Sequence, residues 1–165
     1  MKYFLILIVI ILVVGIVIYF SCCRAVERRY FEKAMSLSSG YSFSRIREVK
    51  GEPIDESWIE FDGWYYKQLV YEGYVFRTRL IEKPDYAREY YTDVVYITDP
   101  SYRIGFSKVG IGSTKKEVKR AYLGIQRIVD IEEENVIGFV DGAVWVEFRF
   151  AEDKRVDQIF ICNGP

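Results

Sequence analysis

The stretch that decides the fold is Trp64–Ile81, which reads WYYKQLVYEGYVFRTRLI. Two runs rich in aromatic and β-branched residues flank the pair Glu72-Gly73, and an acidic residue followed by glycine between such runs is typical of a β-hairpin. The second run alternates, with Phe76 on one face and Arg77 on the other. We therefore predict an antiparallel sheet that buries one face and leaves the other open.

The same signals recur on both sides of this hairpin. Asp62-Gly63 precedes it and Asp141-Gly142 lies in the second half of the chain, so Gly63, Gly73 and Gly142 are predicted to be turn residues. We predict strands over residues 57–61, 64–71, 74–81, 92–98, 126–131, 135–140, 143–150 and 156–161.

Helical patterns precede each group of strands. We predict a short helix over 43–50, with Ile46 and Val49 facing inward and Gly51 after its end. Thr114 and Glu117 form a predicted capping box, in which each side chain binds the backbone N–H of the other residue. An apolar stripe that includes Val118, Tyr122 and Ile125 marks the helix that follows. Residues 24–39 also show a helical period.

The apolar run Tyr3–Cys23 lies between Lys2 and Arg24 without a charge. A helix of this length spans about 31 Å, the thickness of a bilayer's hydrocarbon core. We therefore expect a transmembrane helix that contacts membrane lipid and anchors a single-pass protein. A cleaved signal peptide and a lipoprotein fit less well, because bulky aromatic residues precede Cys22.

The orientation of this anchor stays open on the sequence. Three arginines after the run favour a cytoplasmic C-terminal domain. The two-residue N-terminal tail is how secreted and surface-anchored bacterial domains begin, and we expect the extracytoplasmic orientation. A cytoplasm-facing single-pass protein is the alternative.

The two halves of the chain resemble each other. Tyr71-Glu72-Gly73 matches Val140-Asp141-Gly142, and residues 93–97 match 157–161. The core faces agree best when Phe76-Arg77 is set against Phe148-Arg149. The predicted fold class is α+β, with an N-terminal transmembrane helix followed by two tandem helix-plus-antiparallel-sheet units. The predicted domains are 1–23 (anchor), 24–100 (first repeat with the juxtamembrane helix) and 101–165 (second repeat).

Composition argues against most catalytic chemistry. The 165 residues include no histidine and three cysteines, which removes the usual general base and any metal or disulfide spacing. A net charge of −1 gives no footprint for nucleic acid. Glu132-Glu133-Glu134 is predicted to be a solvated loop. We expect no cofactor, no metal and no enzymatic activity.

The open face is the predicted binding surface, because Trp, Tyr and Arg dominate interface hot spots. The favoured partner is a protein in the cell envelope, and a glycan- or cell-wall-binding or -modifying protein is the alternative. The candidate residues are Tyr65, Lys67, Arg77, Arg79, Trp145 and Arg149.

The run Val109–Val118, followed by Tyr122-Leu123-Gly124, resembles the motif of beta-lactamase inhibitory protein-like domains and of the related small outer-membrane-assembly lipoproteins. The resemblance is clearest over 104–161. It implies an α+β fold, an extracytoplasmic location and binding rather than catalysis. This chain departs from those families because it lacks a convincing lipidation signal and the paired cysteines of some members.

Overall fold

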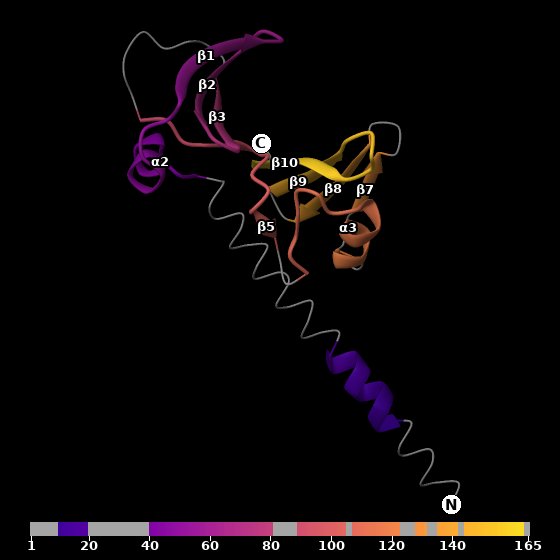
Figure 1. Cartoon of the computed structure of the whole chain (residues 1–165). Helices are drawn as coiled ribbons and strands as arrows, with labels where there is room; N and C mark the ends of the chain where they lie inside the picture. Colours follow the sequence, from indigo (N-terminus) through magenta and orange to yellow (C-terminus); the bar gives the residue numbers. More distant parts are fainter. Residues whose placement is uncertain are drawn as a thin grey trace, which may run out of the picture.

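The computed structural model describes residues 10–19, 40–80, 89–104, 107–122, 128–131, 135–141 and 144–163. Ten short strands and two helices follow a helix over residues 10–19 in these ranges (Figure 1). The elements are α2 (Phe43–Lys50), β1 (Asp55–Phe61), β2 (Trp64–Tyr71), β3 (Tyr74–Leu80), β4 (Val94–Ile97), β5 (Arg103–Ile104), β6 (Val109–Gly110), α3 (Lys115–Ala121), β7 (Ile128–Ile131), β8 (Val136–Asp141), β9 (Val144–Phe150) and β10 (Val156–Asn163).

Eight of the strands form one antiparallel sheet in the order β1-β2-β3-β4-β10-β9-β8-β7, while β5 and β6 pair separately. In this order, β4 to β1 make up one side of the sheet and β10 to β7 make up the other. They meet where β4 pairs with β10. In Figure 1 the sheet is strongly bent, because β1–β3 rise away from β7–β10.

An approximate two-fold axis passes through the β4–β10 junction. Tyr96 of β4 lies opposite Phe160 of β10. On either side of them, Ile97 lies opposite Ile159 and Val95 lies opposite Ile161. On the outer side of this junction, Val75 of β3 lies opposite Tyr96 and Glu147 of β9 lies opposite Phe160. Val75 and Glu147 therefore occupy corresponding positions in the two halves. Two residues further along each strand, Arg77 and Arg149 also correspond.

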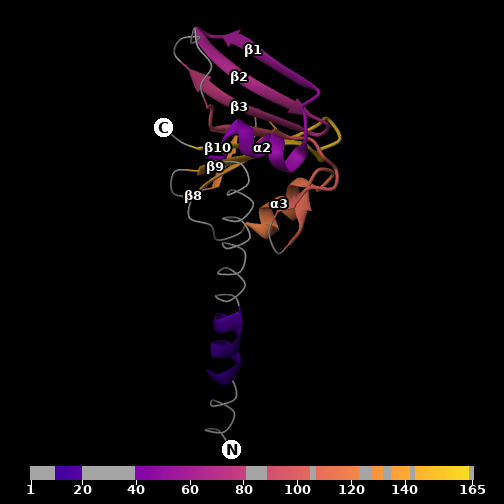
Figure 2. The same cartoon turned by 90° about the vertical axis from the view of Figure 1, so that its left-hand side faces the viewer.

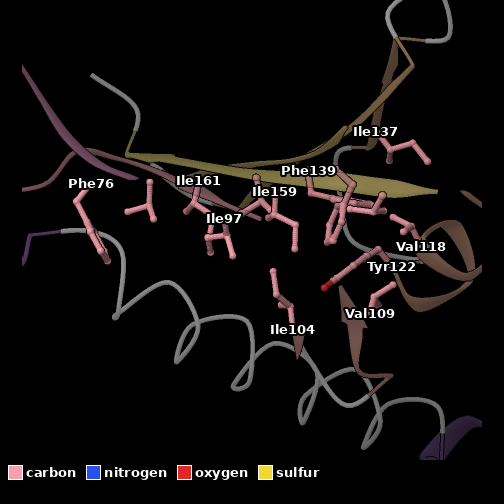
Figure 3. Packing of buried hydrophobic residues seen from close by; sticks show 14 of the residues in the cluster. Phe76, Ile97, Ile104, Val109, Val118, Tyr122, Ile137, Phe139, Ile159 and Ile161 are labelled. Carbon is pink, nitrogen blue, oxygen red and sulfur yellow. The ribbon is translucent and has the colours of Figure 1, made fainter. Parts of the chain in front are cut away.

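One face of the sheet carries the hydrophobic core. Figure 3 shows Phe76, Ile97, Ile159 and Phe139 on this side of the sheet, with the small β5–β6 ladder packed below them. The ring of Tyr122 lies 4.4 Å from that of Phe139, centroid to centroid. Fully burying such side chains stabilises the fold by roughly 1.5–3 kcal/mol each.

Helices α2 and α3 cover this core face. Phe43 and Ile46 of α2 are buried, and so is Val118 of α3. Figure 2 shows α2 below β1–β3 and α3 further down, beside the second half. Among the described residues, no helix packs on the opposite face of the sheet, which we call the open face.

The predicted starts of both helices and the predicted end of α2 are confirmed, whereas α3 ends at Ala121 with Tyr122 as its cap, before the end of the predicted stripe. Ser42 caps α2 by accepting the N–H of Arg45, and Gly51 follows the helix with a φ of 81°. Thr114 and Glu117 form the full capping box at α3. Val49 was predicted to face inward, but it is 65% exposed. The core contacts of α2 come from its first turn, and Val49 lies in the last turn just before the chain leaves the helix.

The predicted turns at Gly63 and Gly73 are also confirmed, with φ values of 74° and 75°. A Cβ on Gly73 would lie 2.7 Å from Cβ of Asp99, so this glycine is needed for close packing as well as for its backbone conformation. Gly142, the Glu132–Glu134 run, Ile125 and the whole of the predicted 24–39 helix lie outside the described residues.

The expected transmembrane helix over Tyr3–Cys23 is wrong. Within the ranges that the structure describes, no helix combines the length and the apolar character that crossing a membrane requires. Residues 10–19 are the part of this run that the structure describes, and they are helical. Hydropathy reports how favourably a segment can be buried, and it does not by itself fix the length of a helix.

The expected fold class needs a second correction. The structure is mostly antiparallel sheet, and α2 and α3 have only 8 and 7 residues. The strands of the two halves join in a single sheet rather than in two separate ones. The physical reason is that β4 and β10 each have an edge that would otherwise be unpaired, and pairing them satisfies the backbone of both.

Candidate functional site

The open face carries a continuous row of polar and aromatic side chains. Strand register places the side chains of Gln68, Arg77, Tyr96, Phe160 and Glu147 on the same side of the sheet. All of them except Gln68, which is buried, have intermediate exposure. These side chains come from five neighbouring strands, from β2 to β9. The row therefore crosses the junction between the halves.

A tight cluster forms on β9. Glu147 accepts a hydrogen bond at Oε1 from Nε1 of Trp145 at 2.8 Å. Its other oxygen, Oε2, accepts from Nε and Nη2 of Arg149 at 3.0 and 2.9 Å. Nη1 of Arg149 donates to Oε1 of Gln158 at 3.0 Å. The carboxylate thus orients an indole and a guanidinium at once, and it neutralises the charge of Arg149.

Gly138 of β8 makes room for the indole of Trp145. A Cβ at this position would lie 3.2 Å from Cζ2 of Trp145 and 3.5 Å from Nε1. The distance of 3.2 Å to Cζ2 is shorter than an ordinary carbon–carbon contact. The missing side chain on β8 therefore lets the ring lie close over the neighbouring strand.

The corresponding position in the first half is arranged differently. Nε of Arg77 donates to Oε1 of Gln68 at 2.9 Å, and Nε2 of Gln68 donates to Oγ of Ser57 at 3.0 Å. The guanidinium carbon of Arg77 lies 4.7 Å from the centre of the Tyr96 ring. Neutral groups and an aromatic face therefore hold this side chain. No carboxylate within the described ranges forms an ion pair with it.

Two aromatic rings occupy the centre of the open face. The centroids of Tyr96 and Phe160 are 5.2 Å apart with a tilt of 56°. Each ring supports an arginine, because the guanidinium of Arg149 lies 5.0 Å from the Phe160 centroid while that of Arg77 lies over Tyr96. The two-fold arrangement of the strands thus places one stacked arginine on each side of an aromatic pair.

Arg79 extends the row along β3. Its guanidinium lies 4.7 Å from the Trp64 ring, and its backbone N–H donates to Oδ2 of Asp93 at 3.1 Å. Burial raises the pKa of the Asp93 carboxyl above its ordinary value. The side chain of Arg79 is exposed and forms no ion pair with an acid of the described residues.

The structure brings together four of the six predicted binding residues and separates the other two. Arg77, Arg79, Trp145 and Arg149 lie on the open face. Lys67 lies on the core side of the sheet, where its Nζ contacts Glu56 at 2.7 Å and lies 5.4 Å from the Trp58 ring.

Tyr65 also lies on that side, next to Glu60, whose charge raises the pKa of the phenol. The choice of face for β2 was therefore wrong. Both faces of this strand carry aromatic and long polar side chains, so its alternation alone does not identify the buried face.

Sequence reasoning missed Gln68, Tyr96, Phe160 and Glu147. The last three alternate with buried neighbours: Val95 and Ile97 beside Tyr96, Ile159 and Ile161 beside Phe160, and Val146 and Phe148 beside Glu147. That alternation could have placed them on the open face. No local signal reveals that they meet, because β4 and β10 are distant in the sequence.

Metal chemistry finds no support in the side chains that the structure places. Among the residues searched, no group of three or more potential ligands comes together. Glu147 is held by Trp145 and Arg149, and Asp55 accepts a hydrogen bond from Ser57 at 2.8 Å. What the arrangement offers is a surface of oriented cations and aromatic rings.

These features define a class: a predominantly antiparallel sheet of eight strands with short helices on one face and an open face rich in arginine and aromatic rings. A similar fold occurs in an extracellular protein containing an SCP domain from Bacillus anthracis strain Ames. The TM-score is 0.51 at 10% identity, over 75% of this chain and 43% of that one. The chain thus spans less than half of that protein, and at this identity the similarity concerns the fold alone.

Two further solved structures are more distant. A cysteine-rich secretory protein from Staphylococcus aureus Mu50 has a TM-score of 0.45 at 10% identity, over 75% of this chain and 44% of that one. A DUF4309 family protein from Bacillus subtilis strain 168 has a TM-score of 0.41 at 9% identity, over 84% and 96%. No protein-family model and no curated protein matches the chain. The resemblance to beta-lactamase inhibitory protein-like domains stays a prediction.

Proposed function

We propose that this protein is a non-catalytic binding module that holds a protein partner on the open face of its sheet, outside the cytoplasm. The observation that carries the proposal is the row of oriented side chains from Gln68 to Trp145. Such a row has the composition of an interface hot spot, in which arginine, tyrosine and tryptophan predominate. The hydrogen bonds within the row fix these side chains before a partner arrives, which lowers the entropy cost of binding.

Two properties of the titratable groups support binding rather than catalysis. The carboxylate of Glu147 already accepts hydrogen bonds from two side chains, so it is poorly placed to move protons. Burial raises the pKa of the Cys162 thiol, which disfavours the reactive thiolate at neutral pH. These groups serve the architecture of the face.

The location outside the cytoplasm draws support from two sources. The B. anthracis protein of similar fold is described as extracellular, and the motif around Val109–Val118 resembles bacterial envelope modules. Protease treatment of intact cells tests this part of the proposal. If the protein resists the protease in intact cells but is digested after lysis, the location is wrong.

Site-specific photo-crosslinking in the organism of origin tests the binding face. A photoreactive phenylalanine analogue replaces Phe160 on the open face, and in a control variant it replaces Val49, which is exposed on α2. We expect a discrete protein adduct from position 160 that disappears with Trp145→Ala. Equal adducts from both positions, or no protein adduct together with Trp145-dependent retention on cell-wall polysaccharide, would contradict the proposal.

A further inference from the structure

The two halves of the open face differ in one charge. Glu147 and Val75 occupy corresponding positions, opposite Phe160 and Tyr96 respectively. In the second half the carboxylate neutralises Arg149, with Nη2 and Oε2 2.9 Å apart. In the first half the corresponding residue is a valine, and Arg77 therefore keeps its full charge.

The guanidinium of Arg77 is held in place, but only some of its N–H groups donate hydrogen bonds to described side chains. Its Nε donates to Gln68, and its Nη1 lies 3.5 Å from the phenol oxygen of Tyr96. Gln68 is 8% exposed and is itself fixed by Ser57. No side chain that the structure describes accepts a hydrogen bond from Nη2. A guanidinium has five N–H donors, so most of its fork remains available at the surface.

A second cation stands beside it. Arg79 is on the same strand and the same face, two residues and about 7 Å further along. Its guanidinium is stacked on Trp64. Asp93 accepts the backbone N–H of Arg79, yet it is not within ion-pair distance of either guanidinium. The other described acids of this face are Glu147, which is paired with Arg149, and Asp55, at the start of the edge strand β1.

We propose that Arg77 and Arg79 form a carboxylate-binding pair, and that the partner presents an acidic segment to the first half of the open face. This inference rests on the proposed function and names the chemistry of the partner. Planar guanidinium groups bind carboxylates through two parallel hydrogen bonds. The aromatic rings beneath both arginines, and the neighbouring Phe160, suit an acidic segment flanked by apolar residues.

Titration of the full chain with a synthetic hexaglutamate peptide, followed by NMR, tests the pair. We expect the Nε–Hε signals of Arg77 and Arg79 to shift, and affinity to fall about fivefold or more in Arg77→Gln and Arg79→Gln. Arg120→Gln removes the same charge from an exposed position on α3 and is expected to leave the affinity unchanged. A hexalysine peptide is expected to produce no shift at these signals.

A second variant tests the comparison between the halves without removing an arginine. Val75→Glu places a carboxylate where Glu147 stands in the other half, and we expect it to weaken hexaglutamate binding as much as Arg77→Gln does. Equal binding in the Arg77→Gln and Arg120→Gln variants would overturn the inference. Tripolyphosphate binding that is at least about tenfold tighter and depends on Arg77 would also overturn it, because the site would then select phosphate.

The proposed function and this inference can fail separately. If the photo-crosslinked partner is lost with Trp145→Ala but kept with Arg77→Gln and Arg79→Gln combined, the binding face stands and the acidic segment does not. If no crosslinked partner forms at the open face, the proposed function fails regardless of what hexaglutamate does.

Discussion

Glu147→Gln removes a carboxylate that holds two side chains of the open face. The carboxylate accepts hydrogen bonds from Trp145 at one oxygen and from Arg149 at the other. Glutamine has the same shape but only one acceptor oxygen, with an amino group in place of the second. Either the indole N–H or the guanidinium must therefore lose its acceptor.

The structure sets the size of the effect. A hydrogen bond to a charged group contributes about 1.5–3 kcal/mol to stability when it is shielded from solvent. The side chain of Glu147 is 16% exposed and that of Arg149 is 39% exposed, so solvent screens the pair in part. We expect Glu147→Gln to lower the free energy of unfolding by about 1–2 kcal/mol.

Urea unfolding of four proteins measures this: wild type, Glu147→Gln, Arg149→Gln and the double variant. The double-mutant cycle is expected to give a coupling free energy of about 1 kcal/mol between Glu147 and Arg149. Arg77→Gln is the matched control, because Arg77 stands in the corresponding position without an acid. It is expected to cost less than about 1 kcal/mol, because only a solvent-screened hydrogen bond to a neutral acceptor and a ring contact are lost.

Two results would refute this reasoning. One is a coupling free energy below about 0.3 kcal/mol, which would mean that the pair contributes nothing beyond its separate side chains. The other is an Arg77→Gln variant as destabilised as Arg149→Gln, which would remove the distinction between the two halves.

Three further predictions concern stability. Gly73→Ala forces a side chain into a positive φ and against the backbone of Asp99, so thermal or urea unfolding is expected to show a loss of about 2 kcal/mol or more. Phe148→Ala empties a fully buried site and is expected to cost about 3–5 kcal/mol in the same assay. The Lys67 ammonium lowers the pKa of the Glu56 carboxyl in the folded protein. The stabilisation from Glu56 is therefore present above the pKa of the unfolded state, and it is lost as the pH falls through the lower pKa of the folded state. The stability difference between wild type and Glu56→Gln, below about 1 kcal/mol for this partly exposed pair, should therefore shrink between about pH 5 and pH 3, and a difference independent of pH would contradict the assignment.

Local signals in the sequence identified most of the secondary structure. The alternation in 74–80 and the glycines at positions 63 and 73 fixed a hairpin ladder, because turn geometry and side-chain period act over only a few residues. Thr114 and Glu117 marked the start of α3 for the same reason. The tandem domain boundaries predicted at 100 and 101 stay a prediction.

Features that depend on distant partners were less accessible. Hydropathy alone predicted a membrane-spanning helix over Tyr3–Cys23 that the structure corrects. Lys67 and Tyr65 were assigned to the wrong face, because the buried face of β2 depends on its register with β1 and β3 and on the helix packed against it.

By itself, the sequence determined that the chain forms antiparallel hairpins with capped helices, and that Arg77, Arg79, Trp145 and Arg149 alternate away from a core. Only the tertiary structure decided that both halves share one sheet. The pairing of Tyr96 with Phe160 joins strands 64 residues apart, and no local pattern encodes such a contact. That same pairing sets Arg77 and Arg149 around a common aromatic centre, where, among the described residues, only Arg149 has an acidic partner, its strand neighbour Glu147.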